Sequence, residues 1–72
     1  MNRESHIAEL NKVILAHGFK PNSYGIYHRD NYSIDTRKNN IKISRDGIKI
    51  VSKPLVQIDC AKLERWFIIH SL

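Results

Sequence analysis

The sequence predicts an α+β domain of two layers, with both helices on one face of an antiparallel sheet. An apolar stripe at helical spacing appears near each end of the chain, and the segments between them are short and rich in β-branched and aromatic residues. The pair Asp46-Gly47 separates two isoleucine-rich segments and is typical of a β-hairpin. We therefore expect a single domain over residues 1–72, with the order α-β-β-β(-β)-α. Its sheet would be a meander of three or four strands, which buries one face and leaves the other open.

The first helix is expected over residues 2–17. Asn2 or Ser5 can accept hydrogen bonds from the free N–H groups at its start, and Gly18 suits the left-handed residue that follows a helix. Phe19 would then pack back against the helix end. The predicted inward stripe consists of Ile7, Leu10, Val13, Ile14 and His17.

Two short strands are expected over residues 24–28 and 32–35, joined by a turn at residues 29–31. Side chains alternate between the two faces of a strand. The residues expected to face inward are Tyr24, Ile26, Tyr32 and Ile34, and Tyr27 would then face outward.

The hairpin at residues 41–52 organises the rest of the sheet. With a two-residue turn at Asp46-Gly47, Ser44 lies opposite Lys49 and Ile43 lies opposite Ile50, while Ile41 faces Ser52. This register predicts a buried face of Ile41, Ile43, Ile48 and Ile50. The open face would carry Lys42, Ser44, Lys49 and Val51.

The last part of the chain should form a second helix over residues 60–70. Pro54 would end the last strand, residues 55–58 are interpreted as extended, and Asp59 is a good N-cap. Since the helix is apolar nearly all round, we expect it to be the more buried of the two. Its predicted inward or apolar residues are Leu63, Trp66, Phe67, Ile68, Ile69 and His70.

The composition limits the possible functions. The chain has 12 Lys and Arg against 7 Asp and Glu, a net charge of +5, which favours phosphate or an acidic protein surface as partner. It contains no apolar run near the roughly 20 residues that a membrane span requires. A single cysteine, Cys60, excludes an internal disulfide framework and fits the cytoplasm, where we expect the protein to reside.

The main candidate site is a group of basic residues in the second half of the sheet. Lysines at alternate strand positions would share the open face and could contact a phosphate backbone, with a tyrosine stacking on a base. The residues are Tyr27, Arg37, Lys38, Lys42, Arg45, Lys49 and Lys53. The preferred hypothesis is thus a non-enzymatic module that binds nucleic acid. One alternative is an inhibitor or adaptor, of the kind encoded by phages and mobile elements, that uses this face on an acidic host protein. Another is that the lysines only prevent edge-to-edge aggregation.

The four histidines do not form a recognisable catalytic or metal-binding motif. His6 and His17 are about three helical turns apart, too far to share a metal, and no CxxC, HxH or HExxH spacing occurs. We therefore expect no metal, no cofactor and no catalytic residue. A histidine-dependent, toxin-like ribonuclease around His28 is kept as a second alternative.

The order of helices and strands on a short basic chain resembles the double-stranded-RNA-binding domain and the small toxins of the HicA type. The resemblance covers most of the chain, in order and length. It implies binding to RNA. The RNA-binding family carries a lysine pair at the start of its second helix, where this chain has Asp59-Cys60-Ala61-Lys62. The toxins carry a glycine and histidine motif on the first strand, where this chain has His28 after Tyr24-Gly25-Ile26-Tyr27. We assign the chain to neither family.

Overall fold

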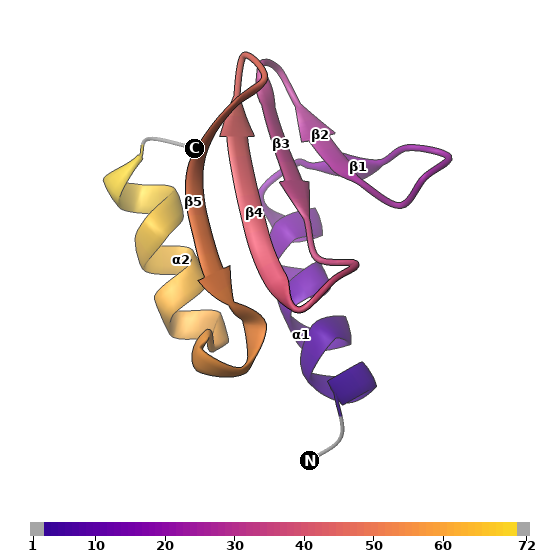
Figure 1. Ribbon diagram of the computed structural model, residues 1–72, viewed down its shortest axis with the longest axis vertical. Helices are drawn as coiled ribbons and strands as arrows, with labels where there is room; N and C mark the ends of the chain where they lie inside the picture. Colours follow the sequence, from indigo (N-terminus) through magenta and orange to yellow (C-terminus); the bar gives the residue numbers. More distant parts are fainter. Residues whose placement is uncertain (1–2, 71–72) are drawn as a thin grey trace.

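The computed structural model describes residues 3–70 and shows two helices and a five-stranded antiparallel sheet, in the order helix, strands, helix (Figure 1). The elements are α1 Arg3–Ala16, β1 Lys20–Pro21, β2 Tyr27–Arg29, β3 Tyr32–Asp35, β4 Asn40–Arg45, β5 Ile48–Pro54, the 3₁₀ helix η1 Leu55–Gln57 and α2 Cys60–Ile69. The strands follow one another across the sheet in chain order, as a meander does. This confirms the predicted α+β fold, with one short strand more than expected. Within residues 3–70, neither helix is long and apolar enough to cross a membrane.

The core lies between the sheet and the two helices, which contact each other on the same side of the sheet. In Figure 1 the sheet lies in front, α1 passes behind it and α2 runs along β5. Leu10 and Ile14 of α1, Leu63 and Phe67 of α2, and Ile41 and Ile43 of β4 meet here, because burial of apolar surface drives the two layers together. The core residues are Leu10, Ile14, Phe19, Tyr27, Ile34, Ile41, Ile43, Leu55, Ile58, Leu63 and Phe67.

The end of α1 is held by a glycine and an arginine. Gly18 has a φ of 88°, the left-handed conformation that its position after the helix predicts. Arg29 of β2 donates a hydrogen bond from Nη1 to the carbonyl oxygen of His17 and lies 4.8 Å from the centre of the Phe19 ring. The guanidinium therefore caps the negative end of the helix and covers a core aromatic ring at the same time. The predicted cap at Asn2 lies outside the described residues.

The loop between β1 and β2 changes which tyrosine is buried. The Asn22 side chain accepts hydrogen bonds from the N–H groups of Tyr24 and Ile26, and Gly25 adopts a φ of 81°. This closed loop occupies positions where the sequence predicts a strand, so β2 begins only at Tyr27. Tyr27 is 9% exposed and Tyr24 is 74% exposed, which reverses the predicted assignment.

The turn between β4 and β5 has the predicted type. Asp46 and Gly47 have φ values of 53° and 80°, and both central residues of a type I′ turn need positive φ. Ser44 lies opposite Lys49, as expected from a two-residue turn.

Beyond this pair a β-bulge shifts the register by one residue. Ile43 lies opposite Val51 and Ile41 lies opposite Lys53, so the predicted pairing of Ile43 with Ile50 is wrong. Ile50 is the extra residue on β5. The sequence pattern could not show the bulge, because isoleucine and valine are equally suitable on the buried side of a strand.

The bulge also changes the environment of the apolar side chains of β5. Val51, predicted on the open face, packs against the core. Ile48 and Ile50, predicted to be buried, are exposed. Ile50 is the unpaired residue of the bulge. Ile48 follows the hairpin turn, and the tip of the β4–β5 hairpin projects beyond the end of α2, so the helix does not cover it (Figure 1).

The segment after β5 forms η1, where the sequence favoured an extended chain. The rest of the prediction for this region is confirmed: β5 ends at Pro54, and Asp59 caps α2 by accepting a hydrogen bond from the Lys62 N–H at 2.7 Å. Ile68 and Ile69 are exposed, and each helix has two buried apolar residues among those described, so the expectation that α2 is the more buried helix is wrong. Only the Leu63 and Phe67 side of the helix reaches the core, as its amphipathic spacing allows.

Candidate functional site

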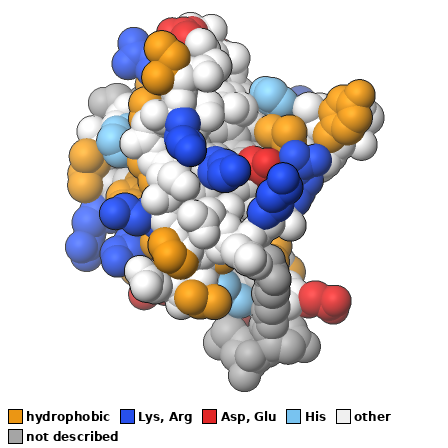
Figure 2. All heavy atoms as spheres, in the orientation of Figure 1, with side chains coloured by type: hydrophobic (Ala, Val, Ile, Leu, Met, Phe, Trp, Pro, Cys, Tyr) orange, Lys and Arg blue, Asp and Glu red, His pale blue; other side chains and the backbone are white. Residues whose placement is uncertain are grey.

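The candidate site is the face of the sheet turned away from α1 and α2, which we call the outer face. Residues that lie opposite each other in an antiparallel sheet share a face. The strand register therefore assigns the outer-face side chains directly. On β2, β3 and β4 they are all polar: His28, Ser33, Asp35, Asn40, Lys42 and Ser44. Figure 2 shows Lys and Arg side chains distributed across this face, with an acidic side chain among them.

The outer face is organised in rows that cross the strands. The longest row runs through all five strands and consists of Lys20, His28, Ser33, Ser44 and Lys49. The next row contains Asp35, Lys42 and Ser52. Since neighbouring strands are about 4.8 Å apart, the long row spans roughly 19 Å and has a lysine at each end. The serine side chains between the charged residues are short, so they leave this surface accessible.

Arg37 neutralises the aspartate of this face. Its Nε lies 3.0 Å from Asp35 Oδ1 and its Nη2 lies 3.0 Å from Asp35 Oδ2, a two-point ion pair. Hydrogen bonding from Arg37 lowers the pKa of the Asp35 carboxyl, and the charge of Lys42 contributes to the shift, while burial opposes it. Asp35 therefore remains ionised at neutral pH and is engaged by Arg37, which leaves the positive charge of Lys42 dominant on its row.

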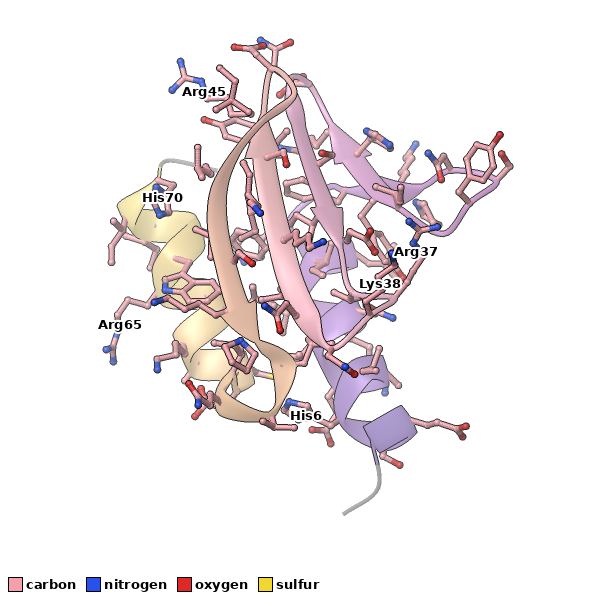
Figure 3. All side chains as sticks on the ribbon, in the orientation of Figure 1. His6, Arg37, Lys38, Arg45, Arg65 and His70 are labelled. Atoms are coloured by element: carbon pink, nitrogen blue, oxygen red, sulfur yellow. The ribbon has the colours of Figure 1, made fainter. Side chains whose placement is uncertain are left out.

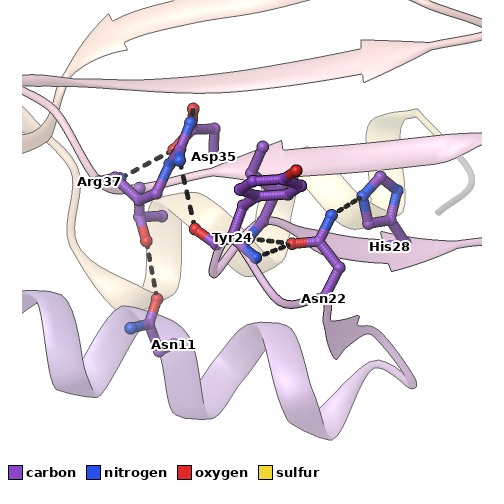
Figure 4. Close-up of polar contacts among 8 residues, drawn as sticks. Asn11, Asn22, Tyr24, His28, Asp35 and Arg37 are labelled. Atoms are coloured by element: carbon purple, nitrogen blue, oxygen red, sulfur yellow. Dashed lines mark hydrogen bonds and ion pairs between the residues drawn. The ribbon is translucent and has the colours of Figure 1, made fainter.

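Tyr24 stands at one end of the outer face, on the loop between β1 and β2. Arg37 Nη1 donates a hydrogen bond to the Tyr24 carbonyl oxygen at 3.2 Å, and its side chain passes over Gly25. Asn22 Nδ2 donates to His28 Nε2 at 3.0 Å. Figure 4 shows these residues as one polar cluster that joins the loop to β2 and to the end of β3. An exposed tyrosine is thus carried by a loop whose backbone is bonded to a guanidinium at the edge of the outer face.

The structure divides the predicted site residues into separate groups. Lys42 and Lys49 lie on the outer face, and Arg37 and Lys38 lie in the β3–β4 connection beside it. Tyr27 is a core residue, so its predicted stacking role on this face is wrong.

Arg45 and Lys53 belong to the other face of the sheet. Arg45 lies opposite Ile48 at the hairpin tip, 3.9 Å from Asp46, and Figure 3 places it far from Arg37. Lys53 lies opposite Ile41 because of the bulge. The predicted footprint is therefore smaller on β5, and it extends instead to Lys20.

The histidines are used in different ways. His28 is on the outer face and bonds to the Asn22 amide, which is neither an acid nor a base. His6 Nε2 donates to the carbonyl oxygen of Leu55, and His17 packs against Phe67 with ring centres 4.3 Å apart. Among residues 3–70, no three His, Cys, Asp or Glu side chains gather as a metal site. Burial raises the pKa of the Cys60 thiol, with smaller contributions from nearby carboxylates such as Glu9, so the thiolate is disfavoured.

Two residues of this site, Lys20 and Tyr24, were not predicted from the sequence. Lys20 was difficult to predict, because a strand of two residues is too short to show the alternation of apolar and polar side chains. The signal for Tyr24 was available: Asn22 followed by Gly25 marks a tight turn, since asparagine side chains bond to the backbone two residues on and glycine tolerates positive φ. No family model, curated protein or solved structure matches the chain.

Proposed function

We propose that this protein is a non-enzymatic module that binds nucleic acid through the outer face of its sheet. The observation that carries the proposal is the position of Lys20, Lys42 and Lys49 on the one sheet face turned away from both helices. Lysines placed on different strands of one face can contact successive phosphates of one backbone. The charge of the face thus matches a polyanion.

The neutral residues of the outer face support this proposal. Ser33 and Ser44 lie between Lys20 and Lys49, and Ser52 lies beside Lys42; all three can donate hydrogen bonds to phosphate oxygens. A protein-binding surface usually has an apolar centre with aromatic anchors, and β2, β3 and β4 place none there. The outer face is therefore better suited to a hydrated, charged ligand.

The test is a binding titration with labelled DNA and RNA oligonucleotides at low and moderate salt. We expect saturable binding that weakens steeply with salt. The slope of log K against log salt concentration should decrease in magnitude by about 0.7 to 0.9 for each phosphate that a variant no longer neutralises. The variant Lys42→Glu with Lys49→Glu should lose binding and keep its fold, because exposed substitutions change stability by only about 0.5 kcal/mol.

The matched control is Lys53→Glu with Arg65→Glu. This variant has the same change in net charge, but Lys53 lies on the helix side of β5 and Arg65 lies on α2, where Figure 3 shows it away from the outer face. Binding should survive in the control. Equal losses of affinity in the two variants would mean that net charge, and not the outer face, attracts the nucleic acid. Absence of binding to any oligonucleotide at low salt would contradict the proposal.

An acidic protein surface is the second candidate partner. The observation that favours it is the exposure of Ile48, which lies opposite Arg45 on the helix side of the hairpin tip, and of Ile50 at the bulge, since apolar side chains beside a cation are typical of a protein contact. This candidate predicts that Ile48→Ser with Ile50→Ser abolishes capture of the partner, whereas binding of oligonucleotides through the lysines would not need the isoleucines.

A further inference from the structure

We infer that the ligand of the outer face is a single-stranded nucleic acid, one of whose unpaired bases stacks on Tyr24. The inference rests on the proposed function and adds the class of nucleic acid and the residue that selects it. Unpaired bases are recognised by stacking on exposed aromatic side chains, and the stacking tolerates any base sequence.

Tyr24 is available for stacking and its loop is held in place. The residue is 74% exposed, the greatest exposure among the described aromatic residues. Its backbone is held at both ends: the N–H donates to Asn22 Oδ1 at 2.9 Å and the carbonyl oxygen accepts from Arg37 at 3.2 Å. The loop is closed by a further bond between the Asn22 N–H and the Ile26 carbonyl oxygen at 2.9 Å. A tyrosine whose backbone is fixed in this way loses less conformational entropy when a base binds than a tyrosine on a loose loop does.

The location of Tyr24 connects it to the charged rows. Arg37 donates one hydrogen bond to the Tyr24 carbonyl oxygen and two to the Asp35 carboxylate, and Asp35 lies opposite Lys42 in the second row. A strand whose base stacks on Tyr24 would therefore begin at the end of the outer face where Arg37 lies. The rest of the strand could then cross the sheet toward Lys42 and Lys49.

The shape of the outer face does not suit the grooves of a duplex. The major groove of DNA admits an α-helix or a two-stranded ribbon. Both helices lie on the other side of the sheet, and the outer-face residues of the central strands include short serines that do not reach far. The β1–β2 loop projects beyond the sheet, as Figure 1 shows, and the aromatic ring that it carries would find no unpaired base in an intact duplex. An open strand has its bases and its phosphates accessible together.

The experiment compares single-stranded and duplex oligonucleotides of equal length with the full chain and three variants. The variants are Tyr24→Ala, Tyr24→Phe, which keeps the ring, and the Lys42→Glu with Lys49→Glu double variant. A single strand containing 2-aminopurine reports stacking directly, since its fluorescence is quenched when the base stacks on an aromatic ring.

We expect the single strand to bind more tightly than the duplex and its 2-aminopurine to be quenched. Tyr24→Ala should weaken binding of the single strand by about 5- to 150-fold, the range of one base–aromatic stack, and abolish the quenching. Tyr24→Phe should retain both. The variants should fold normally, because Tyr24 is exposed.

Two results separate failure of this inference from failure of the proposed function. If the duplex binds as tightly as the single strand and Tyr24→Ala changes neither affinity nor quenching, while the lysine double variant loses binding, the outer face binds nucleic acid but the single-strand inference is wrong. If neither oligonucleotide binds at low salt, the proposed function itself is wrong.

Discussion

Asp35 and Arg37 form a two-point ion pair across the intervening Thr36, with Nε to Oδ1 and Nη2 to Oδ2 distances of 3.0 Å each. Thr36 turns the opposite way and donates to Asn11 of α1, so the pair stands at the point where β3 leaves the sheet. The pair therefore affects both the stability of this corner and the charge of the outer face.

The pair predicts a loss of stability in acid. The pKa of Asp35 is lowered in the folded protein from its ordinary 3.8, mainly by hydrogen bonding from Arg37, so the unfolded state binds a proton more readily. The stabilisation is complete above the unfolded pKa and disappears as the pH falls through the folded one. Asp35→Asn should therefore unfold more readily than the wild type at pH 7, with the difference shrinking below about pH 4. Urea denaturation at several pH values measures this difference in the free energy of unfolding. A difference that stays constant with pH would show that ionisation of Asp35 does not contribute.

The same substitution should strengthen nucleic-acid binding. Asp35→Asn removes a negative charge from the outer face and releases Arg37 to contact phosphate, so affinity at low salt should rise several-fold. Asp46→Asn is the matched control, because Asp46 is at the hairpin tip beside Arg45. Equal gains in the two variants would mean that only net charge changed. Oligonucleotide titrations at two salt concentrations compare them.

Two glycines with similar backbone angles provide a test of the α1 end. Gly18 has φ of 88° and a Cβ there would lie 3.4 Å from the Arg29 side chain, whereas Gly47 has φ of 80° and open space around it. Replacement by alanine should cost about 1 to 2 kcal/mol at either position for the left-handed backbone alone. Gly18→Ala should cost at least as much as Gly47→Ala, since it also crowds the arginine. Thermal unfolding measures both, and an unchanged Tm for Gly18→Ala would contradict the role of this glycine.

The bulge can be tested with a pair of neighbouring substitutions. Val51 packs against the core, and Ile50 is 39% exposed. Val51→Asp should therefore destabilise the fold by about 2 to 3 kcal/mol, the cost of burying a polar group without a partner, and Ile50→Asp by less than about 1 kcal/mol. A regular hairpin without the bulge would produce the reverse order. Chemical denaturation of the two variants decides between the registers.

The sequence was sufficient for features that depend on local chemistry or on strong periodicity. Gly18 and the Asp46-Gly47 turn were predicted because positive φ restricts the residue type, and Asp59 because an N-cap needs a short acceptor. The two-layer fold followed from the apolar stripes of the helices and the isoleucines of β4.

The errors arise where two registers bury similar side chains, or where burial depends on the length of a neighbouring element. Val51 and Ile50 are equally apolar, and only the bulge decides which of them points into the core. Ile48 is apolar but lies beyond the reach of α2. Tyr27 was misassigned because the strand was started too early, and each one-residue error in a strand exchanges its faces. The outer-face positions of Lys42 and Lys49 were predicted correctly, because Lys49 lies on the turn side of the bulge and Lys42 lies on the undisturbed strand.

The bulge on β5 also has a consequence for how this chain can change in length. Elsewhere in the sheet, the loss or gain of one residue would turn every following side chain of that strand to the opposite face. At Ile50 the extra residue is already accommodated, and its removal would place Val51 next to Lys49 in an uninterrupted ladder, with Ile43 still opposite Val51. Position 50 is thus a place where evolution, or an engineer, can shorten a strand of this protein by one residue and leave its two faces in place.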